Sequence, residues 1–549
     1  MRADLVRFLL LSSSAAAGVA LAQVAPDAGA LRQQFDNELK PALPQRAAPL
    51  PDAATAPLTL PDGATLTVHA FRFEGNTLIA AERLRDVVRG YEGHPIGFAD
   101  LQRATLAVAA AYRDAGWIVQ AWLPRQDVTE GVVTIRVVEA RFGGARIEGP
   151  MPLRLSPELV LAEVQARQPV GAPLNAEALD RGLLLASDLP GVAVSGALES
   201  GAADGETALA LRITDEPLVT GELGADDGGS RSTGTERVTA SLTINSPLKA
   251  GDQIRIDLAD SLGSHFGRVA WTTPFGADGL RAGVNASHLD YRLIGADFLA
   301  LHGSGSSSAW GVDFSFPFIR SRQRNLYASL NGERTVFLNR ASGARQSDYA
   351  IDSLALGLNG NQFDDLGGGG ATSASLTLEH GDLRQAHLDP GENPALAGAY
   401  DKLRYGASRQ QVVGDTLSFS GTLAGQYAHK GLDSSARFYL GGPAGVRAYP
   451  VNEGSGDRGE LLSAELHWRL QDAFTLVGFE DWGHVADARG DNTLKGAGLS
   501  LVWSGPWNLN AQATLARRIG TNGDPGAHGR DQDGSLDRNR FWLQARLPL

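Results

Sequence analysis

Apolar and polar residues alternate along many short segments from residue 218 to the C-terminus. In one segment, Ile254, Ile256 and Leu258 alternate with polar or charged neighbours, and the segments near 460–470 and 508–515 repeat the pattern. A period of two predicts β-strands with one apolar and one polar face. Strands with two such faces are typical of a transmembrane β-barrel, which has lipid outside and water inside.

The alternation predicts sixteen strands in this region. They are expected to begin near residues 218, 236, 253, 266, 280, 309, 325, 349, 371, 402, 416, 460, 474, 494, 508 and 540. About twenty residues per strand and turn fit tilted spans of 9–11 residues joined by alternating short and long loops. The chain is therefore predicted to be mainly β, with a 16-stranded transmembrane β-barrel over residues 217–549.

Two regions before the barrel show the same order of strand, helix, helix, strand and strand. This order predicts two α+β domains, over residues 66–142 and 143–216. The first is expected to have strands over 66–73, 117–123 and 132–138, with helices between; the second has helices near 157–166 and 175–187 and closing strands over 192–198 and 207–213.

The first 65 residues divide into three segments. Residues 1–22 combine Arg2 and Arg7 with a short apolar run and small residues at its end, which predicts a secretory signal peptide. Residues 23–40 contain a short helix-forming stretch, and residues 41–65 are rich in proline. Because so short a helix is marginal in water, these residues alone favour a disordered tail with a nascent helix.

A glycine- and proline-rich loop, residues 430–459, lies between two predicted strands. Its centre carries Arg447, and the best candidate anion for this cation is Asp481, on the expected lumen face two strands later. The sequence Val446-Arg447-Ala448-Tyr449 resembles the VRGY loop tip of the two-partner secretion transporters (the TpsB family). Residues Phe479, Asp481 and Gly483 fit that family's F-x-D-x-G strand motif.

The resemblance implies that the loop folds inward and that Arg447 meets Asp481 inside the barrel. We expect such a pair to be partly wet. The chain departs from the family at Ala448, where glycine is usual, so a tighter or altered turn is expected there. The alternative is a surface arginine and an unrelated strand carboxylate.

Further motifs extend the resemblance to the N-terminal half. The segments 112–117 and 188–192 are similar to the first and second POTRA domains of the family. The resemblance also implies that residues 23–40 form a plug helix in the pore, with 41–65 as the linker to the POTRA domains. A second VRGY sequence, at 88–91, lies at the end of a predicted helix and is interpreted as coincidence.

Composition excludes several other functions. The net charge of −13 argues against nucleic acid as a partner, and the absence of cysteine excludes disulfides and thiol catalysis. The eleven histidines lie in no catalytic or metal-binding spacing, so no enzymatic activity, cofactor or metal is expected. The acidic segment Asp531–Gly534 lacks the spacing of an EF-hand and is expected to be an acidic surface loop.

The resemblance implies an outer-membrane translocator with its POTRA domains in the periplasm. It would recognise an unfolded partner exoprotein (TpsA-like) and export it through the barrel. Outer-membrane lipid and the barrel assembly machinery are the other expected partners, and a monomer is expected. Because the chain ends in Leu549 instead of the usual aromatic residue, assembly should be slower. Two alternatives are an insertase for other barrels and a passive porin.

Overall fold

The computed structural model describes residues 26–38, 43–46, 65–385, 393–526 and 529–549. The expected signal peptide and most of the proline-rich linker lie outside these ranges. No helix among the described residues is long and apolar enough to cross a bilayer.

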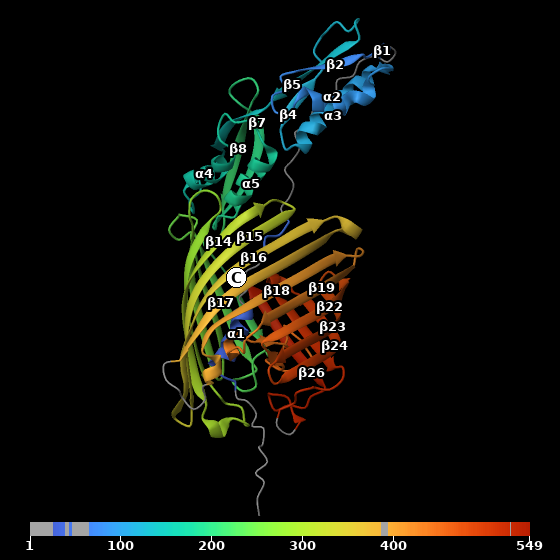
Figure 1. Cartoon of the computed structure of the whole chain (residues 1–549). Coiled ribbons are helices and arrows are strands. Elements are labelled where there is room, and N and C mark those ends of the chain that lie inside the picture. Colours follow the sequence, from blue (N-terminus) through green and yellow to red (C-terminus); the bar gives the residue numbers. More distant parts are fainter. Residues whose placement is uncertain (1–25, 39–42, 47–64, 386–392, 527–528) are drawn as a thin grey trace, which may run out of the picture.

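Sixteen antiparallel strands form a closed barrel, in which β26 pairs with β9 (Figure 1). The strands are β9 (Val219–Asp226), β10 (Arg237–Asn245), β11 (Gln253–Ser261), β12 (Ser264–Pro274), β13 (Arg281–Arg292), β14 (Ser304–Arg320), β15 (Arg324–Ala341), β16 (Ala344–Asp364), β17 (Gly370–Gln385), β18 (Gly398–Val412), β19 (Leu417–Ala428), β22 (Arg458–Gln471), β23 (Phe474–Asp487), β24 (Gly490–Ser504), β25 (Asn510–Arg518) and β26 (Asn539–Pro548). The predicted barrel and its number of strands are confirmed.

The predicted strand starts lie close to the observed ones, and the largest differences are on the longest strands. Strand β14 begins at Ser304 instead of 309, and β16 begins at Ala344 instead of 349. These strands have 17 and 21 residues, so they reach further than the apolar alternation that predicted them. The first residues of both strands pair with the last residues of β15, which lies between them.

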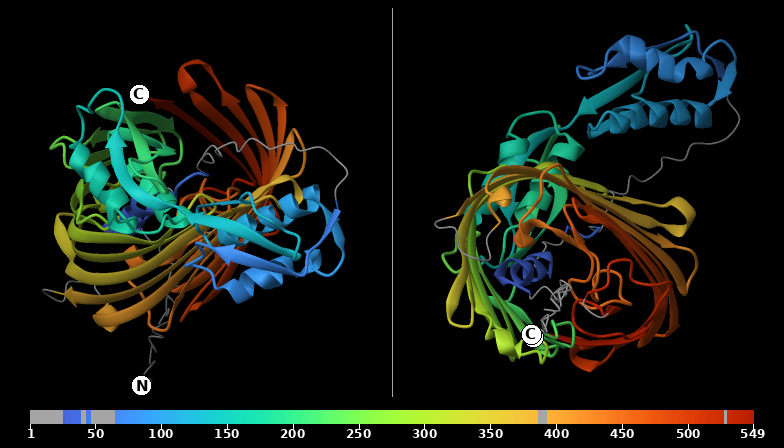
Figure 2. Two further views of the ribbon diagram at one scale, coloured as in Figure 1. Left: turned by 90° about the horizontal axis from the view of Figure 1, so that it is seen from above. Right: turned by 60° about the horizontal axis from the view of Figure 1, so that its bottom comes forward.

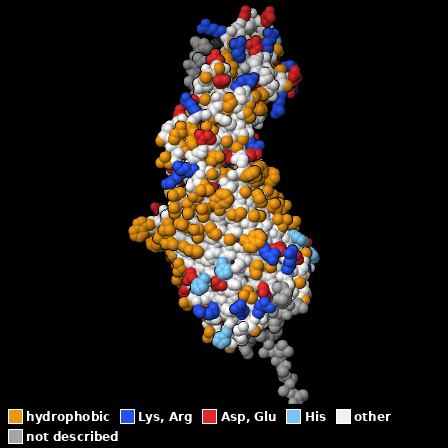
Figure 3. Space-filling model, turned by 90° about the vertical axis from the view of Figure 1, so that its left-hand side faces the viewer, with side chains coloured by type: hydrophobic (Ala, Val, Ile, Leu, Met, Phe, Trp, Pro, Cys, Tyr) orange, Lys and Arg blue, Asp and Glu red, His pale blue; other side chains and the backbone are white. Residues whose placement is uncertain are grey.

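Apolar side chains cover the outer face of the barrel. Leu258, Leu354 and Phe541 are each about half exposed, whereas their strand neighbours on the inner face are buried or half-buried. Figure 3 shows hydrophobic side chains gathered in a band across the face of the barrel that it draws. The alternation along the strands therefore sorts side chains between an apolar exterior and a largely polar lumen, as lipid and water require.

The first N-terminal domain is a three-stranded sheet covered by two helices. Strands β2 (Ala70–Glu74), β5 (Val132–Glu139) and β4 (Val119–Trp122) form the sheet in this order, and β1 (Thr65–Thr67) pairs with β3 (Pro95–Gly97). Helices α2 (Ala81–Val88) and α3 (Phe98–Asp114) bury Leu84, Val108 and Tyr112 against it. The apolar stripe of α3 thus forms the core that its spacing predicted.

The second N-terminal domain repeats this plan. Its sheet has the order β6 (Arg141–Ile147), β8 (Glu206–Asp215) and β7 (Val192–Ser200), packed on α4 (Pro157–Arg167) and α5 (Ala176–Ser187). Strand β6 begins at Arg141, which pairs with Glu206 of β8.

Ion pairs join the second domain to the barrel. Arg320, at the end of β14, makes two hydrogen bonds of 2.7 Å to Asp188 at the end of α5. Arg322 contacts Asp180 at 2.6 Å, and Arg167 of α4 contacts Asp278 in the β12–β13 turn at 2.5 Å. The barrel end that carries these turns therefore faces the N-terminal domains, and the β19–β22 loop starts from the opposite end (Figure 1).

Helix α1 (Ala28–Glu38) lies inside the barrel (Figure 2). Within the predicted segment 23–40 the helix begins at Ala28, because Asp27 caps it by accepting a hydrogen bond of 2.9 Å from the Ala30 N–H. Further along the chain, the Pro44 carbonyl accepts a 2.8 Å hydrogen bond from Asn361 near the domain-side end of β16. The described residues thus run from the lumen toward the end that carries the domains.

Candidate functional site in the barrel lumen

The segment between β19 and β22 folds back into the barrel as a hairpin. Strands β20 (Phe438–Tyr439) and β21 (Ser455–Gly456) pair with each other, and the Val446 N–H donates to the Leu440 carbonyl at 2.7 Å to close the tip. Gly442 has a φ of +117°, which other residues rarely adopt. This segment, residues 429–457, is called the inward loop below.

Arg447 at the tip binds Asp481 of β23 in a bidentate contact. Its Nη2 lies 2.6 Å from Asp481 Oδ1 and its Nε lies 2.9 Å from Oδ2. The backbone N–H of Arg447 also donates to Oδ2, at 3.1 Å. Planar pairing with a carboxylate fixes both position and orientation of the guanidinium group.

The pair is dry. Asp481 is 0% exposed and Arg447 is 8% exposed, so the expectation of a partly wet pair is wrong. The expectation assumed that water fills the lumen around the pair. The inward loop instead covers this part of the wall and excludes water from it.

Three further contacts surround the Arg447 side chain. Glu465 of β22 accepts a hydrogen bond from Nη1 at 2.7 Å, and Ser463 accepts one from Nη2 at 3.0 Å. The guanidinium carbon lies 3.5 Å from the centroid of the Phe479 ring, a cation–π contact. The site prediction did not include Ser463 and Glu465, although the alternation had placed both on the polar face of β22.

The other residues of the two motifs pack around this pair. Val446, Ala448 and Tyr449 are all 0% exposed and form one apolar cluster with Phe479. At Gly483 a Cβ would lie 2.6 Å from a methyl group of Leu440, so only glycine fits beneath the loop. All seven predicted site residues therefore meet in one place.

The structure accounts for the departure from the family at Ala448. The Ala448 methyl group lies against Gly496 of β24, where an added Cβ would be only 2.5 Å away. The φ angle of Ala448 is not positive, so its backbone does not require glycine. The altered turn expected from the substitution is not needed, because Gly496, which pairs with Asp481 in the neighbouring strand, provides the space.

A second set of contacts holds the tip from the C-terminal side. The Trp542 indole N–H of β26 donates to the Arg447 carbonyl at 2.8 Å, and Arg518 Nε donates to the Ala448 carbonyl at 3.2 Å. Arg518 also forms an ion pair with Asp531, which is 2% exposed. The expected acidic surface loop at Asp531–Gly534 is therefore wrong for Asp531, because a buried arginine draws it inward.

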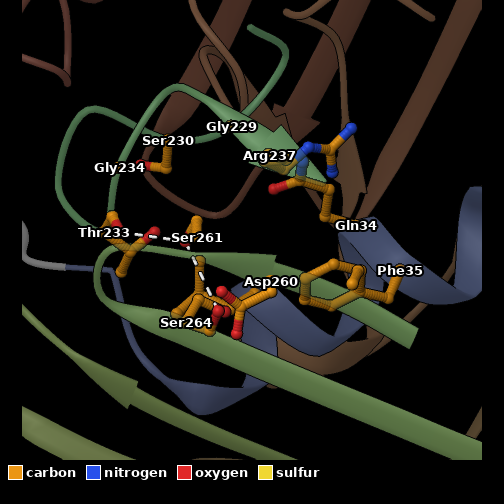
Figure 4. Close-up of a pocket in the computed structure, with 12 residues that line it drawn as sticks. Gln34, Phe35, Gly229, Ser230, Thr233, Gly234, Arg237, Asp260, Ser261 and Ser264 are labelled. Atoms are coloured by element: carbon orange, nitrogen blue, oxygen red, sulfur yellow. Dashed lines mark hydrogen bonds between the residues drawn. The ribbon is translucent and has the colours of Figure 1, made fainter. Parts of the chain in front are cut away.

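The inward loop also touches α1. The Ser434 hydroxyl of η5 (Ser434–Ala436) donates to Asp27 at 2.7 Å. On the other side of α1, Arg32 contacts Ser287 at 2.7 Å and Glu333 at 3.5 Å. A small pocket lies between α1 and the β9–β10 and β11–β12 connections, and Figure 4 shows Phe35 beside it.

The remaining candidates carry no site. The second VRGY sequence lies at the end of α2 and in the 3-10 turn that follows, in the first N-terminal domain, far along the chain from the loop. Among the described residues, no group of three or more histidine and acidic side chains could hold a metal ion.

Comparisons with known proteins agree with this architecture. A family model described as haemolysin secretion/activation protein ShlB/FhaC/HecB matches residues 205–505, and a ShlB-type POTRA domain model matches residues 66–140. The heme/hemopexin transporter protein HuxB of Haemophilus influenzae is 24% identical over 98% of both chains. The outer membrane transporter CdiB of Dickeya dadantii is 23% identical over 82% of this chain and 83% of that protein.

Solved structures show the same fold. CdiB from Escherichia coli superposes with a TM-score of 0.72 at 21% identity, covering 94% of this chain and 97% of that one. BamA from Haemophilus ducreyi, lacking its POTRA domains 1–3, gives a TM-score of 0.52 at 14% identity, covering 88% of this chain and 100% of that one. The chain thus shares its whole architecture with the first of these structures.

Proposed function

The chain belongs to the haemolysin secretion/activation family, whose model matches more than half of it, and from this premise we propose how its inward loop serves export. The protein is an outer-membrane transporter of two-partner secretion, with its POTRA domains in the periplasm. It recognises an unfolded partner exoprotein there and exports it through its barrel. The dry Arg447–Asp481 contact, which fixes the inward loop inside the pore, carries the proposal.

The inward loop positions the narrow part of the pore. Its tip is bound to β22 and β23 through Arg447 and to β26 through the Arg447 carbonyl, so it spans one side of the lumen as a fixed wall. A fixed constriction lets an extended chain pass in contact with protein on all sides. We propose that Arg447 and Asp481 act by holding this wall and not by touching cargo.

Capture of the cargo falls to the POTRA domains in this proposal. Strand β7 forms one edge of the second sheet and β4 forms one edge of the first. An edge strand offers unpaired N–H and carbonyl groups to an extended peptide, which adds to the sheet through main-chain hydrogen bonds. The ion pairs between α5 and the barrel, such as Asp188–Arg320, would keep the second edge near the pore mouth.

The proposal also includes two further partners, lipid and the barrel assembly machinery, and a monomeric state. The apolar band in Figure 3 would contact outer-membrane lipid. The barrel assembly machinery would insert the barrel. A single chain closes its own barrel and would work as a monomer.

Export of the cognate exoprotein tests the proposal. Cells that carry Arg447→Ala or Asp481→Ala should lose secretion, while Arg469→Ala, a lumen-facing control on β22, should secrete normally. Arg447→Lys keeps the charge but not the bidentate geometry, so it should secrete poorly. Correct insertion is checked by heat-modifiable migration of the barrel. Normal secretion by a correctly inserted Arg447→Ala barrel would show that the contact has no part in export.

A further inference from the structure

The lumen wall beneath α1 is aromatic. Five aromatic side chains and one leucine form this aromatic patch, and each is at most 6% exposed: Phe266, Leu289, Tyr291, Phe337, Tyr349 and Tyr400. They come from β12, β13, β15, β16 and β18, near the strand ends opposite the POTRA domains. On the other wall, facing positions are polar, as in Ser500 and Thr514, which bond each other at 2.8 Å. Barrel interiors are usually polar, so the patch needs an explanation.

Helix α1 covers the patch together with the inward loop, whose Leu432 and Ala436 belong to the same apolar cluster. Ala28, Leu31 and Phe35 lie on one face of the helix and belong to the same apolar cluster as the patch. The rings of Phe35 and Phe266 are stacked, with centroids 4.6 Å apart and an angle of 8° between them. Figure 2 shows α1 within the ring of strands. A helix of 11 residues is marginal on its own, so it is a replaceable occupant.

The patch is built to be rigid. Tyr291 donates its hydroxyl hydrogen to Asn339 at 2.9 Å, and Tyr400 donates to Glu379 at 3.2 Å. Phe337 and Tyr349 stack with centroids 4.9 Å apart. The hydroxyls of Tyr291 and Tyr400 are thus bound to the barrel wall, and that of Tyr349 donates to Asp433 of the inward loop at 3.1 Å. Once α1 is displaced, ring surface remains for an apolar ligand.

We propose that the aromatic patch is a second binding site for the exported chain, which takes the place of α1 through its apolar side chains. This inference rests on the proposed function, because α1 and a passing chain compete for the same lumen. Uncovering the patch to water is unfavourable, so whatever displaces α1 must cover it again. Flat ring surfaces accept many apolar side chains, and such a site suits a cargo of changing sequence.

The ligand is an extended segment with apolar or aromatic residues at alternate positions. In an extended strand every second side chain points the same way, about 7 Å apart, and can meet successive rings of the patch. Polar groups at its border already bind α1: Asn339 accepts from the Ala28 N–H at 3.0 Å, and Ser287 accepts from Arg32 at 2.7 Å. Freed of α1, these groups can bind main-chain N–H groups of the ligand.

Because the chain has no cysteine, single labels can be placed at matched alanines. Ala259→Cys carries a nitroxide within the cluster, directly opposite Phe266 in the ladder. Ala270→Cys places the same label in the lumen on β12, outside the patch. Both are made in the full chain with Leu31→Gln and Phe35→Gln, which weaken the seat of α1, and are reconstituted in lipid nanodiscs. The probes are two 16-residue peptides of alternating phenylalanine and serine or alternating alanine and serine.

The expected result is that the phenylalanine peptide immobilises the label at 259 at a concentration at least tenfold lower than the alanine peptide, with little change at 270. In the chain with native α1 residues, binding should weaken at least tenfold. Equal effects of both peptides, or equal responses at both labels, would overturn the proposal. If the peptides or labels do not differ but Arg447→Ala cells still lose secretion, the proposed transport function stands. The patch then serves only to hold α1.

Discussion

The two elements that fill the lumen differ in the contacts at their centres. The tip of the inward loop is fixed by directional bonds, with Arg447 bound at once to Asp481, Glu465 and Ser463. Helix α1 combines apolar packing, of which the Phe35–Phe266 stack is the clearest part, with ion pairs such as Glu38–Arg237 at 2.9 Å. Both seats are buried, so burial alone does not distinguish them.

This difference teaches which element is built to stay. A bidentate ion pair in a dry site loses much of its energy with a small displacement, because an unpaired buried charge is costly. Apolar packing has no preferred direction, and another apolar surface of similar size can replace it. The proposal therefore assigns the loop to the part of the pore that stays and α1 to the part that can be exchanged.

The largest effect should come from removing the charge at the loop tip. Arg447→Ala leaves Asp481 buried without its cation, which should destabilise the folded barrel by about 3–5 kcal/mol. Urea unfolding in detergent, followed by heat-modifiable migration, measures the change. The double variant Arg447→Ala/Asp481→Ala should recover part of the loss, because no charge is then left unpaired. A loss equal to that of Arg469→Ala would contradict a directional seat.

The second prediction concerns α1. Phe35→Ala removes the stack on Phe266 and should weaken the seat by about 3 kcal/mol, the lower end for such a change in a core. That energy corresponds to a change of about a hundredfold in the equilibrium constant between seated and unseated α1. Single-channel recording in planar bilayers should therefore show large openings at least tenfold more often.

Asn37→Ala is the matched control for this prediction. Asn37 lies on the exposed face of the same helix, and its substitution should leave the channel closed. Openings of equal frequency in both variants would mean that apolar packing does not hold α1.

Much of this comparison could be predicted from the sequence. Strand alternation located the sixteen strands because each side chain faces either lipid or water, a choice that local sequence records. The Arg447–Asp481 pair was predicted from two motifs and a shared lumen face. These local patterns do not predict contacts between residues far apart in the sequence. Arg32 and Ser287, for example, form a hydrogen bond although 255 positions separate them.

The remaining errors have two causes. The start of α1 at Ala28 follows from the capping carboxylate of Asp27, a local signal that the helix-forming stretch alone did not include. The inward position of Asp531 depends on Arg518 and on Asn522, which also binds Glu453 of the inward loop at 2.6 Å. Such networks form only when the loops fold together, so composition suggested a solvated surface.

The third prediction uses a buried carboxylate that lacks the partners of Asp481. Glu163 of α4 is 3% exposed, and its Oε2 has no hydrogen-bond partner among the described residues. Burial and the nearby charge of Asp278 raise the pKa of this carboxyl from 4.5 to about 7, although Arg181 opposes the shift. The native state therefore favours the protonated form. Its contribution to stability is full below about pH 4.5 and is lost as the pH rises to about 7.

Glu163→Gln should remove this dependence. At pH 8 the variant should be more stable than the parent by at most about 3 kcal/mol, and at pH 4.5 the two should be equal. Urea unfolding of the second POTRA domain, followed by a fluorophore on Ser195→Cys, measures both. Glu177→Gln, at an exposed position of α5, is the control. Identical pH profiles for Glu163→Gln and the parent would show that a buried carboxylate needs no bidentate partner here.

The smallest effect should come from Ala448→Gly, which restores the residue usual in the family. The change removes a methyl group that fills the space over Gly496 and leaves the ion pair of Arg447 in place. A small cavity and the greater freedom of glycine in the unfolded chain should together cost about 1 kcal/mol. Secretion should stay normal while urea unfolding shifts slightly. A loss of secretion as large as that of Arg447→Ala would show that packing, and not the directional contact, holds the loop tip.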